Sequence, residues 1–99
     1  MDFRVILTEE AIADLQSILG YIADDNPFAA ERVGTALLDH IETLKSFPMR
    51  GTSVGSDPQM RKLIRTPCRI YYQVDSGRAF VTVLHIWHGA RQEPLFPSR

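Results

Sequence analysis

The stretch CRIYYQVDSGRAFVTVLHIWHG, residues 68–89, decides the fold because it predicts two neighbouring β-strands joined by a tight turn. Its first strand, 68–74, is rich in branched and aromatic residues, which favour extended structure. By the period of two, Arg69 and Tyr71 share one face, whereas the alternate positions on the other face are apolar. One face of this strand is therefore expected to pack against a hydrophobic core.

The rest of the stretch predicts a turn and a longer strand. Residues 75–77 form a tight connection, in which Gly77 is expected to adopt the positive φ of a three-residue hairpin loop. The strand 79–88 is largely apolar on both faces, which is typical of a strand inside a sheet. Gly89 is expected to end it.

Toward the N-terminus, the hydrophobic period changes from two to three or four. Thr8 is the predicted N-cap of a first helix. Asn26 then caps a second helix beginning at Pro27, which suits the first helical position because it has no amide hydrogen. Each helix carries one apolar stripe, so together they predict an antiparallel helical hairpin. A short apolar strand, 3–7, precedes them.

The segment 48–59 contains glycines and prolines with few hydrophobic residues, and is predicted to be a loop. A short basic strand, 60–65, follows it. The complete order is β-α-α-β-β-β, which predicts an α+β fold of two layers, a helical hairpin packed on a small, mostly antiparallel sheet. A chain of 99 residues accommodates one domain, spanning 1–99, with an irregular tail over 92–99.

Composition excludes several classes of protein. A hydrophobic fraction of 44% with 23% charged residues is typical of a globular domain. The single cysteine, Cys68, cannot form an internal disulfide, which fits a reducing compartment. The N-terminal apolar run is too short for a signal peptide, and no stretch approaches the roughly 18 apolar residues of a membrane span. We therefore expect a cytoplasmic protein without a membrane partner.

Charge is divided along the chain. Residues 1–59 carry four bases and ten acids, a local balance of -6, whereas 60–91 carry six bases and one acid, a balance of +5. Nine of the eleven bases are arginine, whose guanidinium suits bidentate contact with phosphate or carboxylate. This division indicates either a charged partner surface or a basic sheet that neutralises the acidic helices of the same molecule.

Motifs for metal and nucleotide binding are missing from the sequence. His85 and His88 have a spacing that would pair two ligands on a helix, but residues three apart on a strand point to opposite faces. Gly51 and Gly55 lack the lysine and hydroxyl of a phosphate loop. Cys68 lies in an apolar strand and is expected to be a core residue rather than a nucleophile. We therefore expect neither a metal nor a cofactor.

One set of basic and titratable side chains remains as a candidate site, namely Arg61, Arg65, Arg69, Tyr71, His88 and Arg91. The arginines are candidates for gripping a target or a phosphate backbone. All members except Arg61 are also candidates for acid–base chemistry on a phosphodiester. The structural alternative is that Arg65 and Arg69 bridge helix acids such as Asp14 and that Tyr71 packs. Spacing alone favours this alternative.

Two motifs carry a family resemblance, PCRIYYQVD at 67–75 and VLHIWHGAR at 83–91. With the helical hairpin and the basic strand, they resemble the RelE/ParE toxin superfamily, the toxin halves of bacterial type II toxin–antitoxin pairs, often described as plasmid stabilisation proteins. The resemblance extends from the first strand to Phe96. It implies a cognate antitoxin that wraps the toxin and covers the helical hairpin or the open sheet face.

The resemblance implies one of two activities. RelE-like members cut messenger RNA in the ribosomal A site, and the carry-over would assign phosphate charge to Arg65 or Arg69 and strand-end chemistry to His88 with Arg91. ParE-like members poison DNA gyrase. No lysine cluster precedes the second strand, no tyrosine follows Tyr72, and a pI near 6.3 is low for docking into ribosomal RNA.

We therefore expect a ParE-like toxin that inhibits DNA gyrase. A RelE-like endoribonuclease acting on ribosome-bound messenger RNA is the alternative. A further alternative is an inactive relative that only binds its antitoxin and autoregulates transcription.

Overall fold

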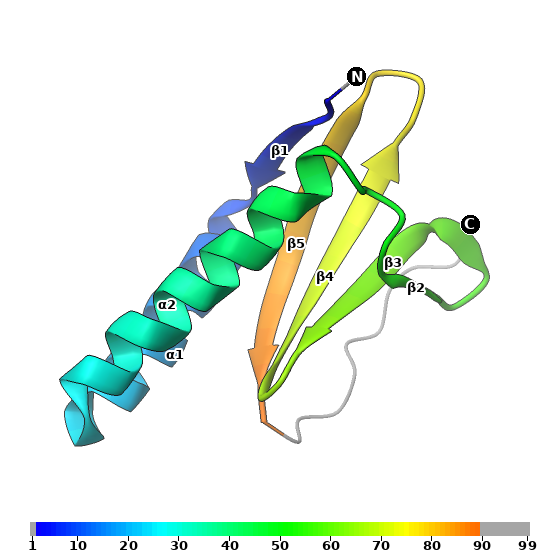
Figure 1. The fold of residues 1–99 in the computed structure, drawn as a ribbon. Coiled ribbons are helices and arrows are strands. Elements are labelled where there is room, and N and C mark those ends of the chain that lie inside the picture. The colour runs from blue at the N-terminus through cyan, green and yellow to red at the C-terminus, as the bar shows by residue number, and fades with distance from the viewer. Residues whose placement is uncertain (1, 90–99) are drawn as a thin grey trace.

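The computed structural model describes residues 2–89 and confirms the predicted two-layer α+β fold. Figure 1 shows two helices lying side by side against one face of a sheet. The elements in chain order are β1 (Arg4–Leu7), α1 (Glu9–Asp25), α2 (Pro27–Glu42), the 3-10 turn η1 (Thr43–Lys45), β2 (Thr52–Val54), β3 (Asp57–Arg65), β4 (Cys68–Asp75) and β5 (Phe80–His88).

The five strands form one sheet in the order β1-β5-β4-β3-β2. After β1 the chain forms the helical hairpin and enters the sheet again at the far edge, as β2. It then continues through β3 and β4 to β5, which lies beside β1 and pairs with it in parallel. All other pairs are antiparallel. The predicted interior position of the strand 79–88 is confirmed, because β5 lies between β1 and β4.

The predicted loop over 48–59 is wrong in part, because this segment contains β2 and the first residues of β3. Strand β2 has only three residues, and its register on β3 shifts between Ser53 and Val54. A strand this short with a bulge shows no alternation in its sequence, and its pairing with β3 is what makes it extended. Gly55, at φ +67°, completes the turn into β3.

The predicted turn after β4 also differs from the structure. Ala79, rather than Gly77, adopts a positive φ, of 57°. The Asp75 carboxylate accepts a hydrogen bond from the Arg78 amide at 3.1 Å, so the side chain of Asp75 organises the start of the turn. The turn is one residue longer than predicted, and its left-handed residue moves to the last position before β5.

The helix caps are confirmed. The Thr8 hydroxyl accepts a hydrogen bond from the Ala11 amide at 3.0 Å, and the Asn26 side chain accepts one from the Ala29 amide at 3.0 Å. Pro27 occupies the first turn of α2, where its missing amide hydrogen leaves no bond unmade. The two caps place the helical reversal at Asn26, so α1 and α2 run antiparallel with a minimal connection.

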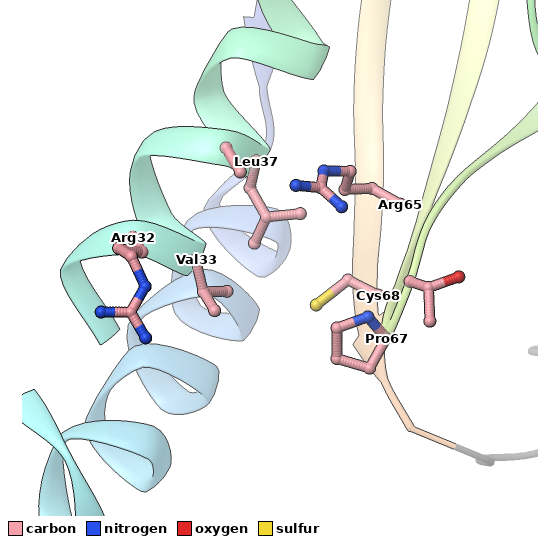
Figure 2. Close-up of a pocket in the computed structure, with 8 residues that line it drawn as sticks. Arg32, Val33, Leu37, Arg65, Pro67 and Cys68 are labelled. Carbon is pink, nitrogen blue, oxygen red and sulfur yellow. The ribbon is translucent and has the colours of Figure 1, made fainter. Parts of the chain in front are cut away.

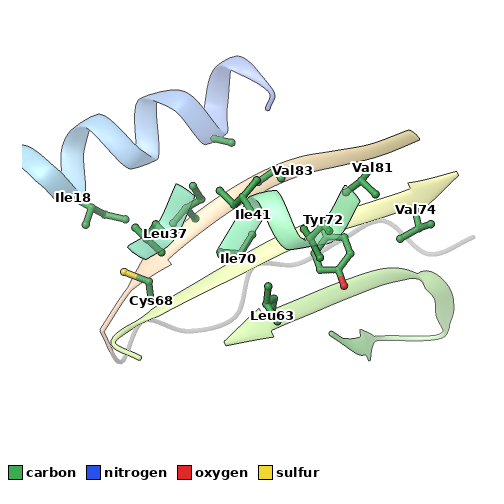
Figure 3. Close-up of a cluster of buried hydrophobic side chains, with 13 residues drawn as sticks. Ile18, Leu37, Ile41, Leu63, Cys68, Ile70, Tyr72, Val74, Val81 and Val83 are labelled. Carbon is green, nitrogen blue, oxygen red and sulfur yellow. The ribbon is translucent and has the colours of Figure 1, made fainter. Parts of the chain in front are cut away.

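The core lies between the helical hairpin and the sheet (Figure 3). It takes alternate residues of β4 and one stripe of each helix, as the sequence periods predict. Along β5 the alternation is interrupted between Val83 and Ile86, where the register on β4 shifts. Its buried members are Ala11, Ile18, Leu37, Ile41, Leu44, Leu63, Cys68, Ile70, Tyr72, Val74, Val81, Val83 and Ile86. Cys68 is a free, buried cysteine of this core, as expected.

Candidate functional site

Three strand ends lie side by side at one end of the sheet, on the face that the helices cover. Arg65 of β3 pairs with Cys68 of β4, and Cys68 pairs in turn with His88 of β5. Because Cys68 belongs to the core, this pairing puts all three side chains on the helix-facing side. Neighbouring strands are about 4.8 Å apart, so the backbones of Arg65 and His88 are separated by about 10 Å.

The Arg65 end of this row opens into a hollow beside α2, which we call the arginine pocket. Figure 2 shows Arg32 projecting from α2 and Arg65 projecting from the sheet toward α2. The pocket has a volume of about 270 Å³. It is lined by Arg32, Val33, Ala36, Leu37, Arg65, Thr66, Pro67 and Cys68. It therefore combines an apolar floor with two guanidinium groups.

The electrostatics around this pocket are positive. The pKa of His40 on α2 is lowered by burial and then by the nearby charges of Arg50 and Arg65, against an opposing effect of Asp39. Burial raises the pKa of the Cys68 thiol, although the charge of Arg65 opposes this. The thiol therefore stays neutral near pH 7, and the apolar floor adds no negative charge to balance the arginines.

The His88 end of the row opens into a second hollow, beside α1, which we call the histidine hollow. It has a volume of about 480 Å³ and is lined by Asp14, Ser17, Ile18, Tyr21, Ile86 and His88. The rings of Tyr21 and His88 lie 6.2 Å apart in a tilted arrangement. An acid, a hydroxyl, a phenol and an imidazole thus meet here, and none of the described lining residues is an arginine.

The edge of β5 explains how α1 is positioned beside this hollow. β1 ends at Leu7, so it pairs with β5 only as far as Val83. Beyond that point the Thr8 amide donates to the Val83 carbonyl at 3.0 Å, and the Thr8 hydroxyl donates to the Leu84 carbonyl at 3.1 Å. Thr8 therefore caps α1 and ties the start of that helix to the sheet edge.

Asp14, six residues after Thr8 along the chain, continues this edge pairing. Its Oδ2 accepts a hydrogen bond from the buried Ile86 amide at 3.0 Å and lies 3.3 Å from His85 Nδ1. The Asp14 carboxylate thus takes the place of a strand carbonyl where β1 no longer reaches. It is engaged by the main chain and by a histidine of β5, not by Arg65 or Arg69 as the structural alternative had it.

The candidate residues Arg69 and Tyr71 lie on the opposite face of the sheet from Arg65 and His88. They alternate along β4 with the core residues Ile70 and Tyr72. Tyr71 is 0% exposed and packs edge-on against the Trp87 ring at 6.3 Å, so the prediction that it packs is confirmed. Arg69 Nη2 lies 3.4 Å from the Gly89 carbonyl. The sheet itself therefore separates the two halves of the predicted constellation.

Arg61 lies at the other end of the sheet, where it holds the β2–β3 hairpin. Its guanidinium donates to the Gly51 carbonyl at 2.8 and 3.0 Å and to the Pro58 carbonyl at 2.8 Å. Beside it the Tyr72 hydroxyl accepts a hydrogen bond from the Gly51 amide at 3.0 Å, and burial raises the pKa of Tyr72. The Arg61 donors are thus used inside the protein.

The structure also brings in Arg32, which the sequence did not point to, and gives Asp14 a partner that the sequence did not predict. Arg32 is the one base of the helical hairpin, a departure that could have drawn attention to it, whereas nothing local connects Asp14 with His85, 71 residues away. The predicted site residue Arg91 and the tail over 92–99 lie outside the described residues. Within residues 2–89 no group of three metal-ligating side chains gathers. In that same range, no helix is long and apolar enough to cross a membrane.

Comparison with known proteins identifies the family. Residues 5–93 match the family of the ParE toxin of type II toxin–antitoxin systems, parDE. The chain belongs to this family. It is therefore a toxin of a type II toxin–antitoxin system, and the predicted RelE/ParE superfamily is confirmed.

Relatives and solved structures agree with this assignment. Toxin RelE2 of Caulobacter vibrioides is 32% identical over 90 residues, covering 89% of this chain and 97% of the relative. Toxin RelE1 of the same organism is 30% identical over 96 residues, covering 93% and 99%. The ParE-family chain also shares its fold with the toxin–antitoxin complex RelBE2 of Mycobacterium tuberculosis (TM-score 0.68, 21% identity, 89% and 99% covered) and a chromosomal ParDE system of P. aeruginosa (0.69, 21%, 88% and 96%).

Proposed function

We propose that this ParE-family toxin inhibits DNA gyrase and is neutralised by a cognate antitoxin. The observation that supports gyrase over RNA cleavage is the division of the candidate residues between the two faces of the sheet. General acid–base catalysis needs its groups within hydrogen-bond reach of one reacting centre. Arg65 and His88 lie on the helix-facing side, whereas Arg69 and Tyr71 lie on the other.

The burial of Tyr71 supports the same proposal. A phenol that acts as an acid or a base must reach the substrate, and Tyr71 is fully buried against Trp87. Net charge supports the same target, because affinity for ribosomal RNA comes from neutralising many phosphates and a protein of net charge -1 has no excess of positive charge with which to do so. A protein target such as gyrase imposes no such requirement.

Solved structures that share this fold support the antitoxin partner. The RelBE2 structure of Mycobacterium tuberculosis is a complex of toxin and antitoxin, and the ParDE structure belongs to a toxin–antitoxin system. We expect the antitoxin to be encoded beside the toxin and to form a hetero-oligomer with it in the cytoplasm.

Purified toxin and gyrase test the target directly. We expect the toxin to reduce DNA supercoiling and to increase gyrase cleavage complexes, and the antitoxin to reverse both effects. Topoisomerase I treated with the same toxin is the control for general interference with DNA. The gyrase proposal fails if supercoiling and cleavage-complex formation are unchanged.

A RelE-like activity is the second candidate, because both Caulobacter relatives are named RelE toxins. It predicts cuts at defined codon positions in messenger RNA on translating ribosomes. Those cuts should disappear in Arg65→Ala or His88→Ala, and naked RNA should stay intact. An inactive relative that only binds its antitoxin would leave growth unaffected when the toxin is induced alone.

A further inference from the structure

We propose that the arginine pocket binds an acidic segment of the antitoxin. A carboxylate of that segment would be held between Arg32 and Arg65, and a neighbouring aliphatic side chain would pack on Val33 and Ala36. This inference rests on the proposed antitoxin partnership and adds to it a place on the toxin and a chemistry of recognition.

The charge of Arg32 has no acidic partner on its own helix. Ion pairs along a helix form between residues three or four positions apart. The residues three and four positions from Arg32 are Phe28, Ala29, Thr35 and Ala36, and none of them is acidic. Throughout residues 2–89, no carboxylate forms a salt bridge with Arg32.

The charge of Arg65 is likewise not neutralised by a neighbour in the sheet. Its cross-strand partner is Cys68, and the next positions on its own face, Leu63 and Pro67, are also uncharged. No acid in the described part of the chain forms a salt bridge with it. Its guanidinium projects toward α2 (Figure 2), on the side of the sheet that carries Arg32.

The size and floor of the pocket favour a peptide side chain. Its volume of about 270 Å³ lies just below the roughly 300–1,000 Å³ of small-molecule sites. Val33, Ala36 and Pro67 provide the accessible apolar area beside the two charges, above the buried Leu37 and Cys68. An acidic residue next to an aliphatic one matches both parts of this surface.

The surroundings disfavour a nucleic acid in the same place. Across residues 8–42 the helical hairpin carries eight acids and one base, Arg32, a local balance of -7. A polyanion that follows α2 away from the pocket would meet this negative charge, whereas a peptide with one or two carboxylates meets only the arginines. The pocket thus fits a short acidic segment better than a phosphate backbone.

A double charge reversal with a matched control tests the proposal. Arg32→Glu/Arg65→Glu inverts the pocket, and Arg4→Glu/Arg78→Glu makes the same charge change at the opposite end of the sheet, where Arg4 and the turn before β5 meet. Antitoxin binding is measured with the purified product of the neighbouring gene, at low and high salt. Circular dichroism melting confirms that each variant folds.

We expect the pocket variant to bind the antitoxin on the order of 100-fold more weakly, because two charge-assisted contacts become repulsive. We expect the control to stay within about threefold of wild type. In cells, the pocket variant should arrest growth even when the antitoxin is present. The milder pair Arg32→Ala/Arg65→Ala should lose most of the salt dependence of binding.

Binding of the pocket variant within about threefold of wild type overturns the proposal. Normal antitoxin binding with lost toxicity also overturns it, because the pocket would then contact the target. If wild-type toxin does not bind the neighbouring gene's product, the antitoxin partnership itself fails, and this inference fails with it. The binding measurements are made without gyrase and are therefore separate from the test of the target, whereas the growth readouts depend on the target.

Discussion

The two hollows beside the helical hairpin start from the same row of strand ends but differ in how their charges are used. In the histidine hollow, Asp14 is bonded to the Ile86 amide and lies beside His85. In the arginine pocket, Arg32 and Arg65 have no salt bridge within residues 2–89. The contacts of the first hollow therefore join α1 to the sheet, whereas the charges of the second hollow are not used in this way. This comparison predicts that mutations in the two hollows act on different properties.

The largest effect on stability is expected from Asp14→Ala. It removes the acceptor of the buried Ile86 amide, and an unsatisfied buried amide costs about 1–3 kcal/mol. Urea unfolding followed by circular dichroism measures this loss. Asp14→Asn is the matched control, because its amide oxygen can still accept the hydrogen bond from Ile86. We expect it to lose less than half as much free energy of unfolding as Asp14→Ala. A change below about 0.5 kcal/mol in Asp14→Ala would show that the carboxylate does not support the sheet edge.

Arg65→Ala should leave the free energy of unfolding within about 0.5 kcal/mol of wild type, as for surface changes away from internal contacts. Its effect is expected instead on His40. Removing the cation should raise the pKa of His40 toward the ordinary value of about 6.5, as followed by NMR titration of the imidazole. An unchanged His40 pKa would mean that Arg65 does not act on α2.

The pH dependence of stability follows from the same shift. Because the folded pKa of His40 lies below its unfolded value, the unfolded state binds more protons between the two values. Stability contributed by neutral His40 is therefore present above the unfolded pKa and decreases as pH falls through this interval. Arg65→Ala should make the decrease smaller, and the same unfolding titration repeated at several pH values measures it.

The smallest effect is expected at the Cys68 thiol. Burial raises its pKa and covers the sulfur, so iodoacetamide should label folded protein much more slowly than unfolded protein at pH 8. Arg65→Ala should slow labelling slightly further, because the arginine favours the thiolate. Equal labelling of folded and unfolded protein would contradict the burial of the pocket floor.

Local sequence signals predicted the helices better than the sheet edges. Thr8 and Asn26 act on amides three residues away, so their caps could be read directly. The strand β2 depends on pairing with β3, and the Asp14–Ile86 bond joins residues 72 positions apart. Contacts of this kind have no local pattern, which is why a loop was predicted over 48–59 and the role of Asp14 was missed.

The candidate site shows the same limit. The period of two correctly put Arg69 and Tyr71 on the same face of their strand. It could not put Arg65 and His88 on the opposite face, because their position depends on how each strand pairs with Cys68. Side-chain type identified the candidates, but topology decided which of them meet.

Induction of the toxin alone in a bacterial host tests the central claim most directly, with DNA damage and messenger RNA decay scored in the same culture. We predict growth arrest and gyrase-dependent double-strand breaks, both of which co-expressed antitoxin prevents, while messenger RNA stays intact. Arrest with codon-positioned messenger RNA cuts and undamaged DNA would contradict it.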